Sequence, residues 1–310
     1  MNRAEGPDVR AIILPFIIFT LIWGSTWIVI RGQIGLVPPQ WSVAYRFIIA
    51  AIAMGIVARV RGEKLGIGWR AAPAIAFLGF AQFCVNFNAV YLAERYITSG
   101  VVATVFALLL IPSSLFGWAM LGQKPGRRFF YGSVVAVGGV ALLFAHELGE
   151  HVLSDRGAIT IGIGWTLVGM VGASLANVFQ ARPQIRHLPL FSLLAWSMAA
   201  GAVFDSLIAF AIAGPPVLTS EPAYWLGLLY LALFASVLAF SLYYPVVRHI
   251  GPARAAYSSM IVPIIAMGFS TWLERYSWNA TTLSGVGLVL LGMALALSRG
   301  KVRISAPDAA

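Results

Sequence analysis

The chain has 310 residues, of which 60% are hydrophobic and only 10% are charged, and its mean hydropathy is +0.86. Soluble proteins carry about 25% charged residues, which they need to keep their surface hydrated. The composition therefore excludes an ordinary soluble protein and predicts that nearly the whole chain lies in lipid or packs against segments that do. The net charge of +10 does not indicate a nucleic-acid partner, because the basic residues lie between apolar segments rather than on one soluble surface.

Apolar runs separated by charged or Pro/Gly-rich breaks predict ten transmembrane helices. About 20 apolar residues cross a bilayer, so ten helices with short loops account for almost the whole length. In chain order, the predicted helices are Ala11–Ile30, Pro38–Ala58, Ala71–Ala93, Ile97–Leu121, Phe129–Ala145, Ile161–Ala181, Pro189–Ala213, Ala223–Val247, Pro252–Leu273 and Thr281–Leu297.

The basic residues between these helices predict the orientation of the chain, because Lys and Arg are enriched in cytoplasmic loops. One set of loops, together with both termini, holds sixteen of them, and the other set holds four. We therefore expect a multi-pass protein of the cell inner (plasma) membrane with both termini in the cytoplasm. The larger set is Arg3, Arg10, Arg59, Arg61, Lys64, Arg70, Lys124, Arg127, Arg128, Arg182, Arg186, Arg248, Arg254, Arg299, Lys301 and Arg303, and the smaller set is Arg31, Arg95, Arg156 and Arg275.

Two stretches of the chain look alike at a fixed offset. Pro112 and Pro263 are 151 residues apart, and so are Gln123 and Glu274. Each proline lies within the fourth predicted helix of its half, and Gln123 and Glu274 lie just after those helices. Five helices per half is an odd number, so the second copy must enter the membrane upside down. The sequence thus predicts an all-α integral membrane protein of ten transmembrane helices in two inverted five-helix repeats. Residues 1–145 form the first repeat, 146–160 an outer-side linker, and 161–310 the second repeat with a cytoplasmic tail.

Several short motifs, in their order and spacing along nearly the full length of the chain, resemble those of the EamA-type members of the drug/metabolite transporter (DMT) superfamily. They depart from the family pattern at Gln123, where glutamate is usual, and at Leu273, where glycine is common. The motifs are Leu21–Thr26, Arg46–Phe47, the stretch from Thr98 to Pro112, the stretch from Gly251 to Pro263, and Leu273–Arg275 followed by Gly285 and Gly292.

This resemblance implies a secondary transporter that exports amino acids or related small organic metabolites. Inverted repeats suit alternating access, in which two similar halves exchange conformations around a site at their interface. The alternatives are a facilitative channel-like permease and a membrane-embedded enzyme. The expected partners are a small-molecule substrate and the lipid bilayer, while coupling to protons and assembly as a homodimer stay open.

Two charged residues lie deep within predicted helices, where a charge costs about 2.5–3.5 kcal/mol on insertion scales. Arg46 lies roughly 12 Å below the outer surface, at 1.5 Å per residue, and Asp205 lies at a similar depth. Arg46 is a candidate for binding a substrate carboxylate, and Asp205 for binding an ammonium group or a proton. Alternatively, the two form a structural ion pair, or Arg46 reaches the outer interface.

Uncharged polar and aromatic side chains complete the candidate substrate site. Gln82 and Asn86 share one helix face at a spacing of four residues, and Thr26 and Asn177 occupy matching repeat positions 151 residues apart. Such groups suit a polar cavity, although hydrogen bonds between helices explain them equally well. Trp23, Tyr243 and Tyr257 are the aromatic candidates, with core packing as the alternative.

The fifth and tenth helices are rich in glycine and alanine and nearly free of polar groups. We expect them to lie outside the cavity, and their small residues favour close helix contacts or a dimer interface.

The sequence offers no catalytic residue, no metal ligand and no cofactor motif. His146 and His151 are five residues apart, whereas the zinc-binding helical pattern needs a spacing of four. All four histidines lie at loops or helix ends, so we expect no enzyme.

Overall fold

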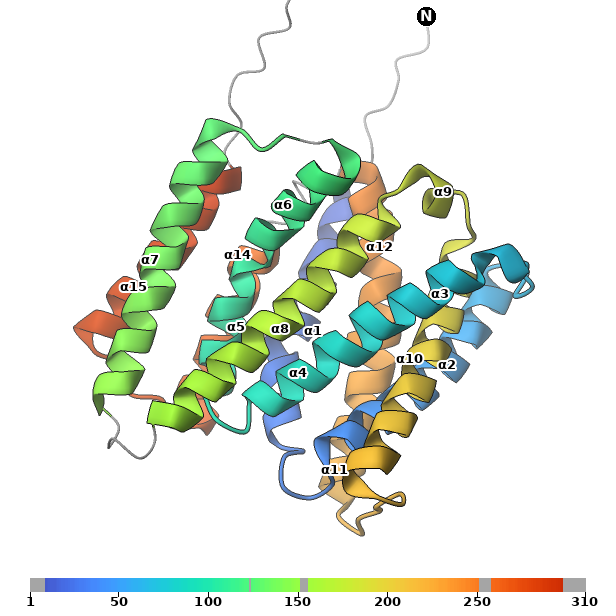
Figure 1. Cartoon of the computed structure of the whole chain (residues 1–310), viewed down its shortest axis with the longest axis horizontal. Coiled ribbons are helices and arrows are strands. Elements are labelled where there is room, and N and C mark those ends of the chain that lie inside the picture. The colour runs from blue at the N-terminus through green and yellow to red at the C-terminus, as the bar shows by residue number, and fades with distance from the viewer. Residues whose placement is uncertain (1–8, 123, 151–155, 251–257, 298–310) are drawn as a thin grey trace, which may run out of the picture.

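The computed structural model describes residues 9–122, 124–150, 156–250 and 258–297, and all regular structure in these ranges is helical (Figure 1). Some long helices change between α, 3-10 and π geometry along their length. In chain order the elements are α1 (Val9–Arg31), α2 (Pro39–Val60), η1 (Trp69–Ala71), α3 (Ala72–Leu78), η2 (Gly79–Val85), α4 (Asn86–Ala93), α5 (Ser99–Phe106), η3 (Ala107–Leu109), α6 (Leu110–Leu121), α7 (Arg127–Glu150), α8 (Arg156–Gln180), α9 (Pro183–Arg186), α10 (Leu190–Ala213), α11 (Pro222–Leu229), η4 (Tyr230–Leu238), α12 (Ala239–Ile250), α14 (Ser258–Leu273) and α15 (Ala280–Leu297).

Eight helical stretches of the described chain are long and apolar enough to cross a membrane, and α14 is an apolar helix of shorter length. The all-α membrane protein predicted from composition is therefore confirmed, while the count of ten spans and their division into repeats stay predictions. Both helices beside the predicted linker extend into it, since α7 reaches Glu150 and α8 begins at Arg156. Residues 151–155, which include His151, lie outside the described ranges.

Two of the long spans contain a π-helical segment at corresponding places. The segment η2 begins at Gly79 and η4 begins at Tyr230, and these positions are 151 residues apart, the offset found for the proline pair. A π-helical turn widens a helix and is frequent at functional sites. Here each segment packs against a neighbouring span, η2 against α10 and η4 against α2.

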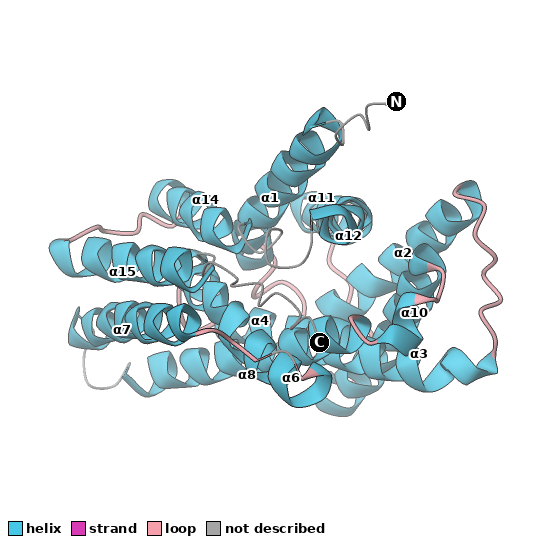
Figure 2. Ribbon diagram, turned by 90° about the horizontal axis from the view of Figure 1, so that it is seen from above, coloured by secondary structure: helices cyan, strands magenta, loops and turns pink. Residues whose placement is uncertain are grey.

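Helices α7 and α15 pack closely side by side at one end of the molecule, and α2 packs against α10 at the other (Figure 2). Glycines make the first contact possible. A Cβ atom built on Gly139 would lie 2.6 Å from the backbone oxygen of Gly285, and one built on Gly132 or Gly292 would meet the backbone of the opposite helix. The close helix contacts predicted for these residues are therefore made within one chain, and the homodimer stays a prediction.

The largest apolar cluster lies between these two ends, where α1, α2, α10, η4 and α12 meet. Its buried aromatic members include Phe19, Phe47 and Phe83, which contact one another or nearby rings at centroid distances of 5–6 Å. The buried guanidinium of Arg46 lies against this cluster, over the ring of Phe47.

Candidate substrate site and polar network

Arg46 is buried in the middle of the bundle, with 1% of its surface exposed. Its Nε donates to Ser236 Oγ of η4 over 3.1 Å, and its guanidinium lies over the rings of Phe87 and Phe47, 4.3 Å and 5.3 Å from their centroids. The aromatic faces stabilise the cation. Nη1, however, has no hydrogen-bond partner, so one strong donor of a buried cation is left for another acceptor.

Asp205 does not pair with Arg46. Its Oδ1 accepts from Asn88 Nδ2 over 2.6 Å, its Oδ2 makes no hydrogen bond, and its fully buried carboxyl group also interacts with the thiol of Cys84. Neither residue takes part in an ion pair among the described residues. The ion pair that similar depth suggested is therefore absent from this conformation: Asp205 bonds with Asn88 of α4, and Arg46 bonds with Ser236 of η4.

The predicted uncharged residues are buried, and two of them keep an unused acceptor. Gln82 and Asn86 lie on the η2–α4 span, and Gln82 Oε1 and Asn86 Oδ1 have no hydrogen-bond partner. Thr26 donates to the carbonyl of Ile22 in its own helix over 2.8 Å, so its hydroxyl is already used. Asn177 on α8 is half-buried.

The predicted aromatic residues Trp23 and Tyr243 pack against each other, with ring centroids 4.9 Å apart. The indole of Trp23 also donates to the carbonyl of Ala235 over 3.2 Å. In this conformation both rings therefore belong to the aromatic core. Tyr257 lies outside the described residues.

A chain of buried polar groups extends from the neighbourhood of Arg46 towards the face that we predict to be outer. Tyr91 interacts with the charge of Arg46, and its hydroxyl donates to Gln33 Oε1 over 3.0 Å. Gln33 Nε2 in turn donates to the carbonyl of Tyr224, whose hydroxyl bonds with Ser42 over 2.8 Å. These bonds join the loop after α1 with α2, α4 and α11.

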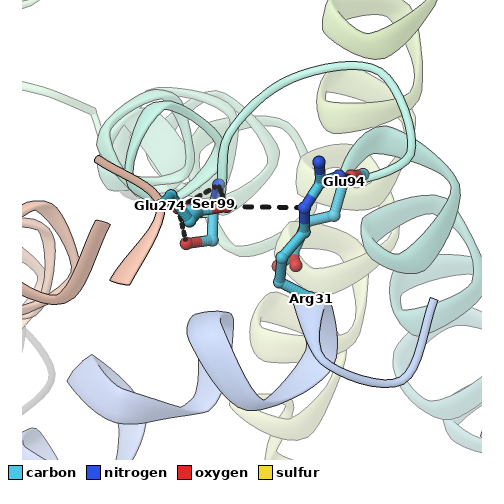
Figure 3. A network of polar contacts seen from close by, with 4 residues as sticks. All are labelled: Arg31, Glu94, Ser99 and Glu274. Atoms are coloured by element: carbon cyan, nitrogen blue, oxygen red, sulfur yellow. Dashed lines mark hydrogen bonds and ion pairs between the residues drawn. The ribbon is translucent and has the colours of Figure 1, made fainter. Parts of the chain in front are cut away.

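A second polar network closes the same face, where α1 ends, α14 ends and α5 begins (Figure 3). Glu274, directly after α14, accepts from both the backbone nitrogen and the hydroxyl of Ser99, and its shortest contact is 2.6 Å to Ser99 Oγ. The first amides of a helix lack partners within it, and the helix dipole favours an anion there. Glu274 therefore caps α5.

Arg31 links Glu274, the residue that caps α5, to the end of α4. Its Nε lies 3.5 Å from Glu274 Oε1, and its Nη1 donates to the backbone carbonyl of Glu94. Figure 3 shows Arg31 between Glu94 and the Glu274–Ser99 pair. One half-exposed arginine from α1 thus connects the α4–α5 loop with the end of α14.

Glu94 is the unusual member of this network. Its side chain is fully buried, yet neither carboxylate oxygen has a hydrogen-bond partner. Burial and the nearby charge of Glu274 raise the pKa of Glu94 well above its usual value, and Arg31 lowers it in part. The arrangement holds two carboxyl groups beside one guanidinium.

Reasoning from sequence missed most of this polar network. Asn88, Tyr91 and Ser236 are uncharged residues within apolar spans, and Gln33 follows a predicted helix end. Arg31 was counted only as an orientation signal, and Glu94 sits at a predicted helix end, where a charge is normally hydrated. The usable signals are the short distance in sequence from Glu94 to the Thr98–Pro112 stretch and the position of Glu274 within the Leu273–Arg275 motif.

Two surface grooves lie away from these polar groups. The larger, with a volume of ≈ 600 Å³, is lined mainly by apolar side chains of α2 and α10 such as Ile48, Val203 and Phe210. In the described part of the chain, no three His, Cys, Asp or Glu side chains gather as a metal site would require.

An all-helical bundle with several apolar spans defines a polytopic membrane protein. The EamA-like transporter family matches residues 10–145 and 160–298, so the chain belongs to that family.

Curated relatives agree with this assignment. The uncharacterized inner membrane transporter YedA of Escherichia coli is 29% identical over 89% of this chain and 87% of its own length. The uncharacterized transporter YoaV of Bacillus subtilis is 24% identical over 86% of this chain and 89% of its own length. A Salmonella typhimurium protein named "Probable amino-acid metabolite efflux pump" is 24% identical over 94% of this chain and 96% of its own length.

A solved structure titled only "Crystal structure of protein" shares the fold. It matches with a TM-score of 0.68 and 16% identity, covering 92% of this chain and 96% of its own. At this identity the match speaks for the fold alone. The resemblance to EamA-type DMT transporters predicted from the motifs is confirmed by the family match, and the chain is a membrane transporter.

Proposed function

We propose that the chain is a secondary transporter that exports amino acids or related small organic metabolites across the inner membrane by alternating access. The observation that carries this proposal is the buried guanidinium of Arg46, whose Nη1 has no partner. A carboxylate is its natural acceptor, because charge-assisted hydrogen bonds to guanidinium are strong and directional. The name of the Salmonella relative supports the same substrate class.

The architecture that we propose for this cycle is two inverted five-helix repeats. Three features support it: the 151-residue offset between η2 and η4, the pairing of α2 with α10, and the pairing of α7 with α15. Further contacts also occur in matching pairs, such as α4 with α8 and α12 with α1. A site between such halves can face either side in turn.

The substrate site that we propose is centred on Arg46. Gln82, Asn86 and Asp205 contribute unused buried acceptors, which fit the ammonium group of an amino acid. Trp23, Thr26, Asn177, Tyr243 and Tyr257 are assigned to the same site as its wall. Several of these side chains pack against one another here, so the proposal requires helix movement before substrate enters.

The direct test is flux into proteoliposomes that contain the purified protein. A carrier should transport amino acids or other small carboxylates with saturation, and unlabelled substrate on the opposite side should accelerate exchange several-fold, because the loaded protein reorients faster than the empty one. A linear, non-saturating flux without this acceleration would favour the channel-like permease. A carboxylate without an amino group, compared with its amino acid, would separate the contributions of Arg46 and Asp205.

The orientation is tested separately. We expect reporters fused after Ala310 to be active only as cytoplasmic reporters, because sixteen basic residues lie on that side and four on the other. A reporter inserted between Pro216 and Glu221, in the loop after α10, should give the opposite result. A C-terminus on the outer side would leave an odd number of spans and remove the basis for the inverted repeats.

A further inference from the structure

The carboxyl group of Glu94 is placed where a charge is hard to maintain. It is fully buried, both of its oxygens lack partners, and the negative charge of Glu274 acts on it. An isolated ionised carboxylate in an apolar setting is so unfavourable that the group normally takes up a proton instead. Its surroundings therefore favour the neutral acid.

Among the described residues, the cation whose charge acts on Glu94 is Arg31, and it is already engaged. Arg31 pairs with Glu274 and donates to the backbone carbonyl of Glu94 rather than to its carboxylate. Burial is the main cause of the raised pKa of Glu94, Glu274 adds to it, and Arg31 opposes it. One positive charge beside two carboxyl groups is balanced when one of them is protonated, and Glu94 is the more deeply buried of the two.

Other ionisable groups around Glu94 do not change this balance. Tyr91, on α4, interacts electrostatically with the carboxyl group of Glu94. On the elements packed against α4, α2 contributes the buried Arg46, η2 contributes Cys84, and α8 carries its one charged residue, Arg156, at its exposed first position. Among the described residues, the charges that act on Glu94 are those of Arg31 and Glu274.

We propose that Glu94 is a proton-binding site, loaded from water at the predicted outer face and occupied when Arg31, Glu274 and Ser99 hold the ends of α1, α14 and α5 together. This inference rests on the alternating access proposed above. When these ends separate, water reaches Glu94 and Arg31 is released from Glu274. The O–H bond of the carboxylic acid then breaks, its proton passes to water, and the carboxylate remains as a hydrated ion.

The sign of the pH dependence follows from linkage. The conformation with the higher Glu94 pKa is the closed one, so it binds the proton more tightly than the open one does. Closure is therefore favoured as the outer pH falls, and opening is favoured as it rises. For a single proton, the ratio of closed to open protein changes at most about tenfold per pH unit.

The experiment measures this ratio without any substrate. Spin labels on cysteines replacing Leu36 and Trp272, both exposed at the predicted outer face, report the distance between the loop after α1 and the end of α14. The full-length protein carries Cys84→Ala, so that it has no other thiol, and is placed in lipid nanodiscs. Pulsed electron–electron distance measurements follow it from pH 5 to pH 9.

We expect the short-distance population to fall as the pH rises, with a slope that approaches tenfold per unit. Glu94→Gln mimics the protonated acid, so it should stay in the short-distance state at every pH. Arg31→Gln should reduce that state throughout. Arg95→Gln removes an exposed charge from the same loop and should keep the pH response of the parent protein.

Two results would overturn the inference: a parent protein whose distances do not depend on pH, or a Glu94→Gln variant that keeps the parent response. If that variant cannot be purified, Glu94→Asp serves instead, and an unchanged midpoint has the same meaning. Failure of the proposed function looks different. If the distance between the spin labels depends on pH but no substrate flux is found, only the transport proposal is contradicted. If exchange is saturable but the distance does not depend on pH, only the proton-binding site is contradicted.

Discussion

Replacing Arg46 by glutamine should abolish most transport of carboxylate substrates while leaving the protein folded in the membrane. Glutamine keeps hydrogen-bonding capacity and removes the positive charge that we assign to substrate binding. Losing a buried, charge-assisted contact costs about 2 kcal/mol or more, which is more than tenfold in affinity. The measurement is the half-saturation concentration and maximal rate of uptake into proteoliposomes, with a substrate identified in the flux screen.

The matched control is Arg59→Gln, which removes the same charge from an exposed position on the same helix. It should change transport less than twofold. The double variant Arg46→Gln, Asp205→Asn decides between substrate binding and a structural pair. A structural pair predicts that Arg46→Gln destabilises the protein and that Asp205→Asn restores it. Recovery of both yield and transport in the double variant would contradict our assignment of Arg46.

Replacing Gly139 by alanine should lower the thermal stability of the protein strongly. The added Cβ would lie 2.6 Å from both the oxygen of Gly285 and the nitrogen of Val289, which are backbone atoms of α15. Overpacking of this kind costs about 1–3 kcal/mol, because two helices must move apart. Thermal unfolding in detergent, followed by the retention of monodisperse protein, measures the loss.

The neighbouring Gly138 provides the control, since a Cβ built on it meets nothing within 4 Å. Gly138→Ala should leave stability unchanged or raise it slightly, because alanine favours the helix over glycine by about 1 kcal/mol. Equal effects of the two substitutions would mean that the α7–α15 contact is looser than described. Gly285→Ala against Gly287→Ala repeats the comparison on the opposite helix.

The sequence predicted the membrane class and the helix positions well because both depend on local composition. Charges are excluded from lipid, so gaps in the apolar pattern mark the loops within a few residues. The end of the fifth helix was misplaced because α7 continues as a helix through the polar residues as far as Glu150. Hydropathy measures contact with lipid, and a helix can extend beyond the bilayer without changing geometry.

The polar contacts were less predictable because they depend on which helices are neighbours. Arg46 and Asp205 have opposite charges at similar depth, yet Asp205 bonds with Asn88 and Arg46 bonds with Ser236. Depth in the bilayer does not give position around the bundle. Glu94 was not predicted for a related reason. A charged residue at a helix end is normally exposed to water, and only the arrangement of the surrounding loops shows that this one is buried.

The cross-pairing of helices has a consequence for how such a chain is assembled. The closest contacts, α7 with α15 and α2 with α10, each join residues before position 151 to residues after position 155. Under the two-repeat proposal, equivalent helices meet across a pseudo-two-fold axis, as identical subunits do in a symmetric dimer. The covalent connection between the halves would then mainly raise their local concentration. Residues 1–150 and 156–310, made as separate polypeptides in one membrane, would form an antiparallel heterodimer with the same interface.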